Sequence, residues 1–189
     1  MNRLLTGGII FMLIGVVLFG VNVKNVVLTL KPGVDLYELE DWSALENGAH
    51  ISTDVDFIFD YYMYEEDNGR QTKRNYMIPS FTIEGEDIYM DKYISVQVGA
   101  AKFGDYDPIV ADSQAWWGYE TEEFPTEAVT VDGYLRKLKN DEKGFLEDYL
   151  GSMGMEQSEM DNAIVPYVIV PFDSSSAKAG FIGSGALFL

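Results

Sequence analysis

Side-chain character alternates with a period of two from Asp54 to Tyr64, DVDFIFDYYMY. Successive strand residues point to opposite faces of a sheet, so this period of two is typical of a β-strand. One face carries the apolar set that we expect to enter the core: Val55, Phe57, Phe59, Tyr61 and Met63. The acidic run that follows ends in Asn68-Gly69, a dipeptide that favours a tight turn.

Further apolar runs between turn residues predict more strands. We expect them at residues 75–82, 93–98, 128–138 and 164–170. Pro79 falls within the first of these and lacks a backbone donor, so it indicates a sheet edge or a strand end. An acidic turn over residues 156–161 should lead into the last strand.

Two segments have helical spacing. Asp107-Pro108 provides an N-cap followed by proline at the first helical position. Asn140-Asp141-Glu142 opens a second helix, and Gly151 or Gly154 is suited to ending it. Together the patterns predict an α+β fold, with a mixed or antiparallel sheet of about five strands and two short helices.

An apolar run without charged residues, LLTGGIIFMLIGVVLFGVNV, extends from Leu4 to Val23. A helix of about 20 residues rises about 30 Å, which matches the hydrocarbon core of a bilayer. The alternative is a cleaved signal peptide, but no Ala-x-Ala site lies between Leu18 and Lys24. We therefore predict a transmembrane helix over residues 1–23 that precedes a strand-rich globular domain over residues 24–173.

A second uncharged run, AGFIGSGALFL, extends from Ala179 to Leu189 and is too short to span a bilayer. We interpret residues 174–189 as a linker and the start of a truncated second transmembrane helix. A final hydrophobic strand, or a tail docked on the domain, is the alternative. A short leader with Arg3 precedes the first apolar run, as in export signals, so we expect a cell-membrane protein with one or two passes and an extracytoplasmic domain.

Acidic side chains outnumber basic ones, with 31 Asp and Glu against 13 Lys and Arg and a formal net charge of -18. This charge excludes nucleic acid as a partner, because its binding depends on cations that neutralise phosphates. Basic proteins and divalent cations are compatible, and the charge also keeps a domain soluble. The chain has no cysteine, which excludes disulfides, thiolate metal sites and a cysteine nucleophile.

Three aspartates, Asp54, Asp56 and Asp60, fall on the outward face of the predicted long strand. Calcium prefers several carboxylate oxygens, so these residues form a candidate metal site. They also offer a carboxylate pair for acid–base chemistry. The alternative is an outer face that only contacts solvent.

Aromatic and acidic residues gather in the stretch WWGYETEE. Aromatic rings beside carboxylates can bind a sugar or a cationic ligand. The candidate ligand-binding residues are Trp116, Trp117, Tyr119 and Glu122. The alternatives are tryptophans at a membrane interface or partly in the core.

The only histidine is His50, and without a second histidine or a cysteine most transition-metal sites are excluded. We expect His50 to cap a turn. The chain contains neither a phosphate-binding loop nor a nucleophile elbow, so we predict no catalytic residues and no cofactor.

Two runs, VTVDGYLRKL from Val129 to Leu138 and VPYVIV from Val165 to Val170, flank a short helix. This layout resembles bacterial membrane-anchored families of unknown function, which implies a membrane helix, a strand-rich domain and, where the tail continues, a second membrane helix. It is also similar to the domains of organelle ubiquitin ligases that lie beside a membrane. The chain lacks the RING cysteines of those proteins, so no ligase activity is implied.

These patterns favour a membrane-anchored domain without enzymatic activity that binds another protein or organises a membrane complex. Membrane lipid would then be its partner through the N-terminal helix. Two other hypotheses stay open. One is a carboxylate-based enzyme or ligand-binding domain that acts on cell-envelope glycans, and the other is a calcium-responsive domain.

Overall fold

The computed structural model describes residues 32–84 and 87–172 of the chain. Gly33 to Pro171 form one compact unit, and the fold below is the fold of this unit. The predicted membrane helix of residues 1–23 and the C-terminal segment of residues 174–189 lie outside the described residues. Within the described ranges, no helix is long and apolar enough to cross a membrane.

A mixed sheet lies at the centre of the unit and confirms the predicted α+β class. In the described residues it has six strands, in the spatial order β1-β5-β6-β4-β3-β2. β4 and β6 are parallel, and the other neighbouring pairs are antiparallel. The strands are β1 (His50–Val55), β2 (Tyr61–Asp67), β3 (Arg70–Glu84), β4 (Asp87–Gly99), β5 (Val129–Lys137) and β6 (Ile164–Pro171).

The predicted continuous strand from Asp54 to Tyr64 is wrong, because the chain leaves the sheet after β1 and re-enters it in β2. These two strands lie at opposite edges of the sheet, and residues 56–60 cross between them. The crossing segment runs along helix α2 (Phe103–Trp117), where the amide of Ile58 donates to the Ser113 hydroxyl at 3.1 Å.

The crossing segment alternates like a strand because both of its faces are buried. Phe57 and Phe59 belong to one hydrophobic cluster, and Ile58 belongs to the other. Their exposed fractions are 0%, 5% and 0% respectively. An apolar side chain on the presumed outer face, here Ile58, is the sequence feature that distinguishes this segment from a half-exposed strand.

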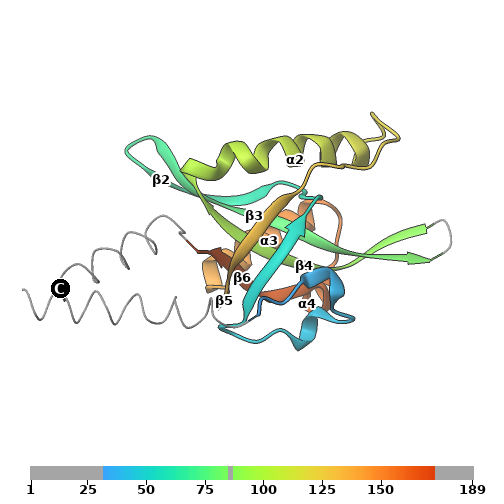
Figure 1. The fold of residues 1–189 in the computed structure, drawn as a ribbon, viewed down its shortest axis with the longest axis horizontal. Helices are drawn as coiled ribbons and strands as arrows, with labels where there is room; N and C mark the ends of the chain where they lie inside the picture. The colour runs from blue at the N-terminus through green and yellow to red at the C-terminus, as the bar shows by residue number, and fades with distance from the viewer. Residues whose placement is uncertain (1–31, 85–86, 173–189) are drawn as a thin grey trace, which may run out of the picture. The chain divides into compact units, whose positions relative to one another are not determined.

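β3 and β4 form a long hairpin whose outer part, in the described residues, pairs only with itself. β2 pairs with β3 no further than Tyr76, and β6 pairs with β4 from Tyr93 onward. Pro79 lies beyond the pairing with β2, so β3 is an edge there, as the missing amide of proline requires. Figure 1 shows this outer part projecting away from the helices as an arm.

Three α-helices pack on the sheet in the described part: α2, α3 (Asn140–Ser152) and α4 (Gln157–Ala163). α3 begins at Asn140, as predicted, although its N-cap is Lys139, and Gly154 lies just after its end with a φ of 95°. α2 begins before the predicted Asp107, because a 3-10 turn, η3 (Ala100–Lys102), leads directly into it. Pro108 therefore lies inside the helix rather than at its first position.

The predicted acidic turn at residues 156–161 is also wrong, because most of it is α4. Glu156 is the N-cap of this helix, and the Glu159 carboxylate accepts the Glu156 amide at 2.9 Å. Acidic side chains are favourable at a helix N-terminus, where they satisfy free amides and oppose the positive end of the dipole. The acidic residues that suggested a turn therefore cap the N-terminus of α4.

Two hydrophobic clusters cover the two faces of the sheet. One cluster joins the sheet to α2 and to two short 3-10 helices, η1 (Leu36–Glu38) and η2 (Trp42–Ala44). The other joins it to α3 and α4 through Leu146, Leu150 and Met160. Figure 1 shows α2 lying along one side of the sheet. The unit therefore has helices on both faces of its sheet.

Candidate functional site

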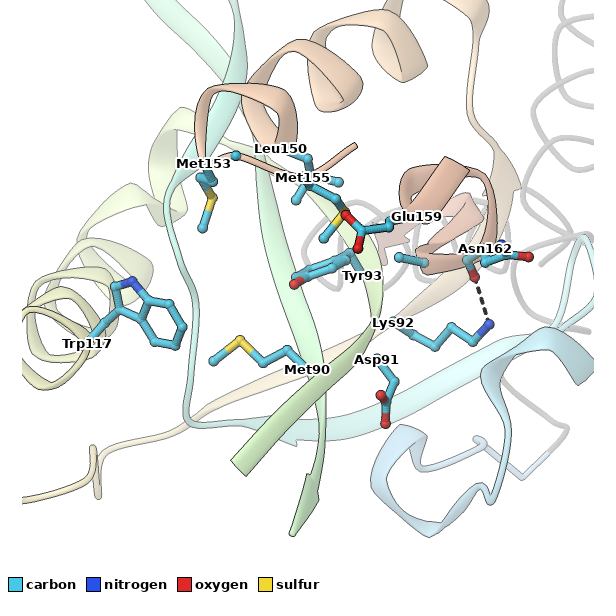
Figure 2. Close-up of a pocket in the computed structure, with 12 residues that line it drawn as sticks. Met90, Asp91, Lys92, Tyr93, Trp117, Leu150, Met153, Met155, Glu159 and Asn162 are labelled. Atoms are coloured by element: carbon cyan, nitrogen blue, oxygen red, sulfur yellow. Dashed lines mark hydrogen bonds between the residues drawn. The ribbon is translucent and has the colours of Figure 1, made fainter. Parts of the chain in front are cut away.

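An open groove with a volume of about 620 Å³ lies where the second hydrophobic cluster reaches the surface. Four elements line it: β4, the C-terminal end of α2, the end of α3 with the turn after it, and α4. Three of its lining residues are methionines, Met90, Met153 and Met155, and we call it the methionine-lined groove. Figure 2 shows these side chains and Trp117 around the opening.

Buried apolar residues form the floor of the groove. Tyr93, Leu150 and Ala163 are at most 8% exposed. Trp117 and Met153 at the rim are 50% and 41% exposed, although both are large apolar side chains. Exposed apolar surface in a concave place is typical of a binding site, because a ligand there removes it from water.

The turn after α3 places two of the methionines. Gly154 adopts a left-handed conformation, which glycine tolerates without strain, and Met153 and Met155 flank it. The amide of Met155 donates to the Leu150 carbonyl at 3.2 Å. The backbone of the turn is therefore held in place, while the thioether side chains can adapt to what they contact.

A polar edge bounds the groove beside α4. The Lys92 ammonium donates to the Asn162 carbonyl at 2.7 Å, which joins β4 to α4, as the dashed line in Figure 2 shows. The Asp91 carboxylate accepts the Thr82 hydroxyl at 2.5 Å, and Figure 2 shows it pointing away from the methionines. Glu159 also lines the groove, and Figure 2 shows its carboxylate beside Met155 and Tyr93, so the lining is apolar in part and polar in part.

The side chains that line the groove suit ligand binding better than catalysis. Burial raises the pKa of Tyr93 above its ordinary value of 10.0, and the charge of Asp91 raises it further. The phenol is therefore neutral at physiological pH. The lining contains no histidine, serine, threonine or cysteine, so it holds none of the usual nucleophile–base pairs.

One of the predicted tryptophans joins the groove. Trp117 lines it and packs edge-on against Phe59, with ring centroids 5.3 Å apart. Trp116 instead packs against Phe57 and Phe124, at centroid distances of 5.8 and 5.1 Å. The two adjacent tryptophans therefore have different roles, one at the rim and one in aromatic packing.

The other two residues of the predicted ligand-binding cluster lie away from the groove. Tyr119 is 97% exposed with a φ of 59°, and Glu122 is exposed in the loop after α2. Neither lines the groove. The structure thus does not bring Trp116, Trp117, Tyr119 and Glu122 together as one site.

The structure does not gather the three aspartates of the predicted metal site into one cluster. Among the described residues, no group of three histidine, cysteine, aspartate or glutamate side chains is placed to hold a metal ion. The three aspartates do not share a strand face, because the sheet is interrupted after β1. Asp54 accepts the Thr130 hydroxyl at 2.6 Å, and Asp60 accepts the Gln114 side-chain amide at 3.2 Å. Asp56 lies in the crossing segment, where burial raises its pKa.

His50 begins β1 rather than capping a turn. Its Nε2 lies 2.6 Å from an Asp132 carboxylate oxygen on β5, the strand that pairs with β1. This cross-strand contact lies outside the groove lining. His50 therefore links β1 to β5.

Sequence reasoning missed the groove, because its residues come from four elements that are distant along the chain. A signal was nevertheless present. The chain has 8 methionines, and two of them flank a glycine just beyond a predicted helix. Flexible apolar side chains at an exposed turn are unusual enough to suggest contact with a partner.

The fold and the groove define an α+β domain with an open groove lined by apolar and polar side chains. Residues 1–180 match the model of one protein family, described as Domain of unknown function (DUF8577). The chain belongs to this family, which confirms the resemblance to a family of unknown function. No curated protein and no solved structure matches the chain.

Proposed function

We propose that this chain is a membrane-anchored protein without enzymatic activity, whose domain binds another protein through the methionine-lined groove. The groove itself carries the proposal, because three methionines and a half-exposed tryptophan surround a buried apolar floor. Methionine side chains are flexible and polarisable, so surfaces rich in them accept apolar side chains of different shapes. Such a surface suits a protein segment better than one rigid small molecule.

Charge indicates which segments the groove accepts. The chain has a net charge of -18, and two carboxylates, Asp91 and Glu159, belong to the groove lining. Complementary charge speeds the encounter of two proteins and disfavours partners of the same sign. The partner segment is therefore expected to combine apolar side chains with lysine or arginine.

Two observations support the membrane anchor as part of this function. The run from Leu4 to Val23 is uncharged and has the length of a bilayer-spanning helix. The family match extends over residues 1–180, so the apolar run and the domain belong to the same family unit. The anchor would tether the domain to the membrane on its extracytoplasmic side, where the domain meets partners of the envelope.

Peptide selection on the full chain in detergent micelles tests the binding site. Random peptides of about 12 residues, a length typical of linear recognition segments, should yield binders with apolar and basic residues. Met153→Lys should weaken their binding at least about tenfold, because it removes a thioether and places a positive charge on the rim. Phe145→Lys is the matched control, since Phe145 is exposed on α3 outside the groove lining.

The outcomes separate the hypotheses. A selection without binders, or binders that tolerate Met153→Lys, would contradict the proposed site. A glycan array is the parallel experiment for the alternative of glycan binding. Binding of an envelope glycan that Trp117→Ala abolishes would favour that alternative over a protein partner.

Carbonate extraction of membranes tests the anchor. A transmembrane helix keeps the full-length chain in the membrane pellet, because its burial in lipid does not depend on charge. Replacement of Ile14 and Val17 in the apolar run by arginine should release the chain. Recovery of the unaltered chain in the carbonate supernatant would contradict the anchor.

A further inference from the structure

The arm formed by β3 and β4 has a free edge beside the methionine-lined groove. β4 lies between β3 and β6, but β6 pairs with it only from the Tyr93–Ile164 contact onward. Before that point β4 has strand partners on the β3 side alone, within the described residues. A strand with one unpaired side presents backbone donors and acceptors to a further strand.

The groove lies beside this free edge of β4. Four consecutive residues of β4, Met90 to Tyr93, line it. Met90 and Tyr93 share one face of the strand, because the register shift places them opposite Phe81 and Pro79, which are two residues apart on β3. The groove lies on this face, at the point where β4 loses its β6 partner. A partner in the groove is therefore within reach of the β4 backbone.

A bulge shapes the same stretch. Asp91 and Lys92 stand opposite the single residue Ser80, because the register shifts between Pro79 and Phe81. The Lys92 amide is satisfied by the Ser80 hydroxyl at 3.0 Å. Bulges and charges at an edge disfavour pairing between identical strands, so a second copy of this acidic chain is a poor occupant.

Apolar surface continues along the arm beyond the groove. Ile88 and Tyr89 of β4 are 43% and 47% exposed. They are neighbours in the strand and so lie on opposite faces of the arm. A strand added to the β4 edge would contact apolar side chains on both of its faces.

We propose that the partner binds by β-strand addition: an extended segment of another protein pairs with the free edge of β4, and its alternate side chains enter the methionine-lined groove. The inference rests on the proposed function and specifies its geometry. Backbone pairing supplies affinity in this mode, and the pockets for alternate side chains supply selectivity. The occupant is a segment in which apolar residues alternate with others that include lysine or arginine, because the chain is strongly acidic.

Backbone N-methylation of the selected peptides distinguishes this geometry from helical docking. In an added strand, every second amide of the ligand donates to β4, and the amides between them point away. Methylation of one alternating set should weaken binding to the full chain at least about tenfold, and methylation of the other set should change it less than about threefold. Slower amide exchange in β4 before Tyr93 on peptide addition is the matching readout on the protein.

The failures of the two proposals are distinguishable. Two outcomes would overturn strand addition but leave the groove as the binding site. In one, peptides that need Met153 have apolar residues at helical spacing. In the other, they lose affinity equally with either methylated set. Peptides that tolerate Met153→Lys, or a selection without binders, would overturn both. Self-association of the chain that blocks peptide binding would show that a second copy occupies the edge, and would overturn the proposed partner.

Discussion

Glu142 is the one charged residue that the described part of the chain buries completely, with an exposed fraction of 0%. Arg136 of β5 donates to both of its carboxylate oxygens, at 2.8 and 2.9 Å. The amide of Lys139 adds a third bond at 2.8 Å and caps α3. The carboxylate therefore joins β5 to the start of α3, whose other end forms the rim of the groove.

The protonation of Glu142 follows from this environment. Burial alone would raise its pKa, but the hydrogen bonds of Arg136 and Lys139 and their positive charges bring the pKa below its ordinary value of 4.5. A carboxyl group with a lowered pKa in the folded state stabilises the fold at pH values above its unfolded pKa. That stabilisation is lost as the pH falls through the folded pKa.

We expect Glu142→Gln to lower the free energy of unfolding by about 2 kcal/mol at pH 7, because it leaves the Arg136 charge without its counterion. This loss is smaller than the roughly 3 to 5 kcal/mol typical of a fully buried pair, because the Arg136 side chain is 28% exposed. Thermal melting of the full chain in detergent, at several pH values, measures the effect. The difference between the two proteins should shrink as the pH drops below about 4.5.

Glu147→Gln is the control for this substitution. Glu147 pairs with Lys143 of the same helix at 2.8 Å, and both side chains are partly exposed. Exposed pairs contribute about 0.5 kcal/mol or less. An equal loss of stability in the two variants, or a difference for Glu142→Gln that persists in acid, would show that the buried pair does not act as described.

At the scale of elements, sequence patterns predicted what depends on local chemistry. α3 and the strands β5 and β6 follow their predicted ranges, because caps, turn residues and apolar periodicity coincide there. The sheet-crossing segment was mistaken for a strand, because burial on both faces is a tertiary property. α4 was mistaken for a turn, because its capping acids resemble a solvated loop. Of the candidate site only Trp117 was predicted, since the other groove residues meet through the fold.

The contact between β5 and β6 gives a test at this scale. A methyl group at Gly133 would lie 2.5 Å from the Val170 carbonyl oxygen and 2.8 Å from the Pro171 Cα, so one strand would have to move. We expect Gly133→Ala to destabilise the domain by about 2 kcal/mol or more. The melting temperature measures this loss, and amide exchange should show it first in β5 and β6.

Gly144→Ala provides the matched control within α3. A methyl group there meets no atom within 4 Å, and alanine favours a helix more than glycine does. The free energy of unfolding of this variant should exceed that of the unaltered protein by about 0.5 to 1 kcal/mol. If Gly133→Ala proved as harmless as Gly144→Ala, the close packing of β5 on β6 would be contradicted.

At the scale of the whole molecule, charge is the dominant feature. The chain has a net charge of -18, and repulsion among its acidic side chains opposes folding. Salt shortens the range of the repulsion from about 30 Å at 0.01 M to about 3 Å at 1 M. Binding of a basic partner would relieve the same repulsion, so stability and partner binding are linked.

We expect the melting temperature of the full chain to rise by about 5 °C or more between these two salt concentrations, which corresponds to about 1.5 kcal/mol for a domain of this size. A variant with lysine in place of the exposed Glu66, Glu122, Glu123 and Asp148 serves as control. Its melting temperature should depend less on salt. An equal dependence in both proteins would mean that ion-specific effects, rather than charge repulsion, govern the response.

Methionine-methyl NMR tests most directly whether the groove is the binding site. The full chain, labelled at its methionine methyl groups, is titrated with a selected peptide, and signals are assigned by single Met→Leu replacements. The Met90, Met153 and Met155 signals should shift, while Met63 on the far strand β2 should not. Shifts at Met63 without shifts at the three groove methionines would contradict binding in the groove.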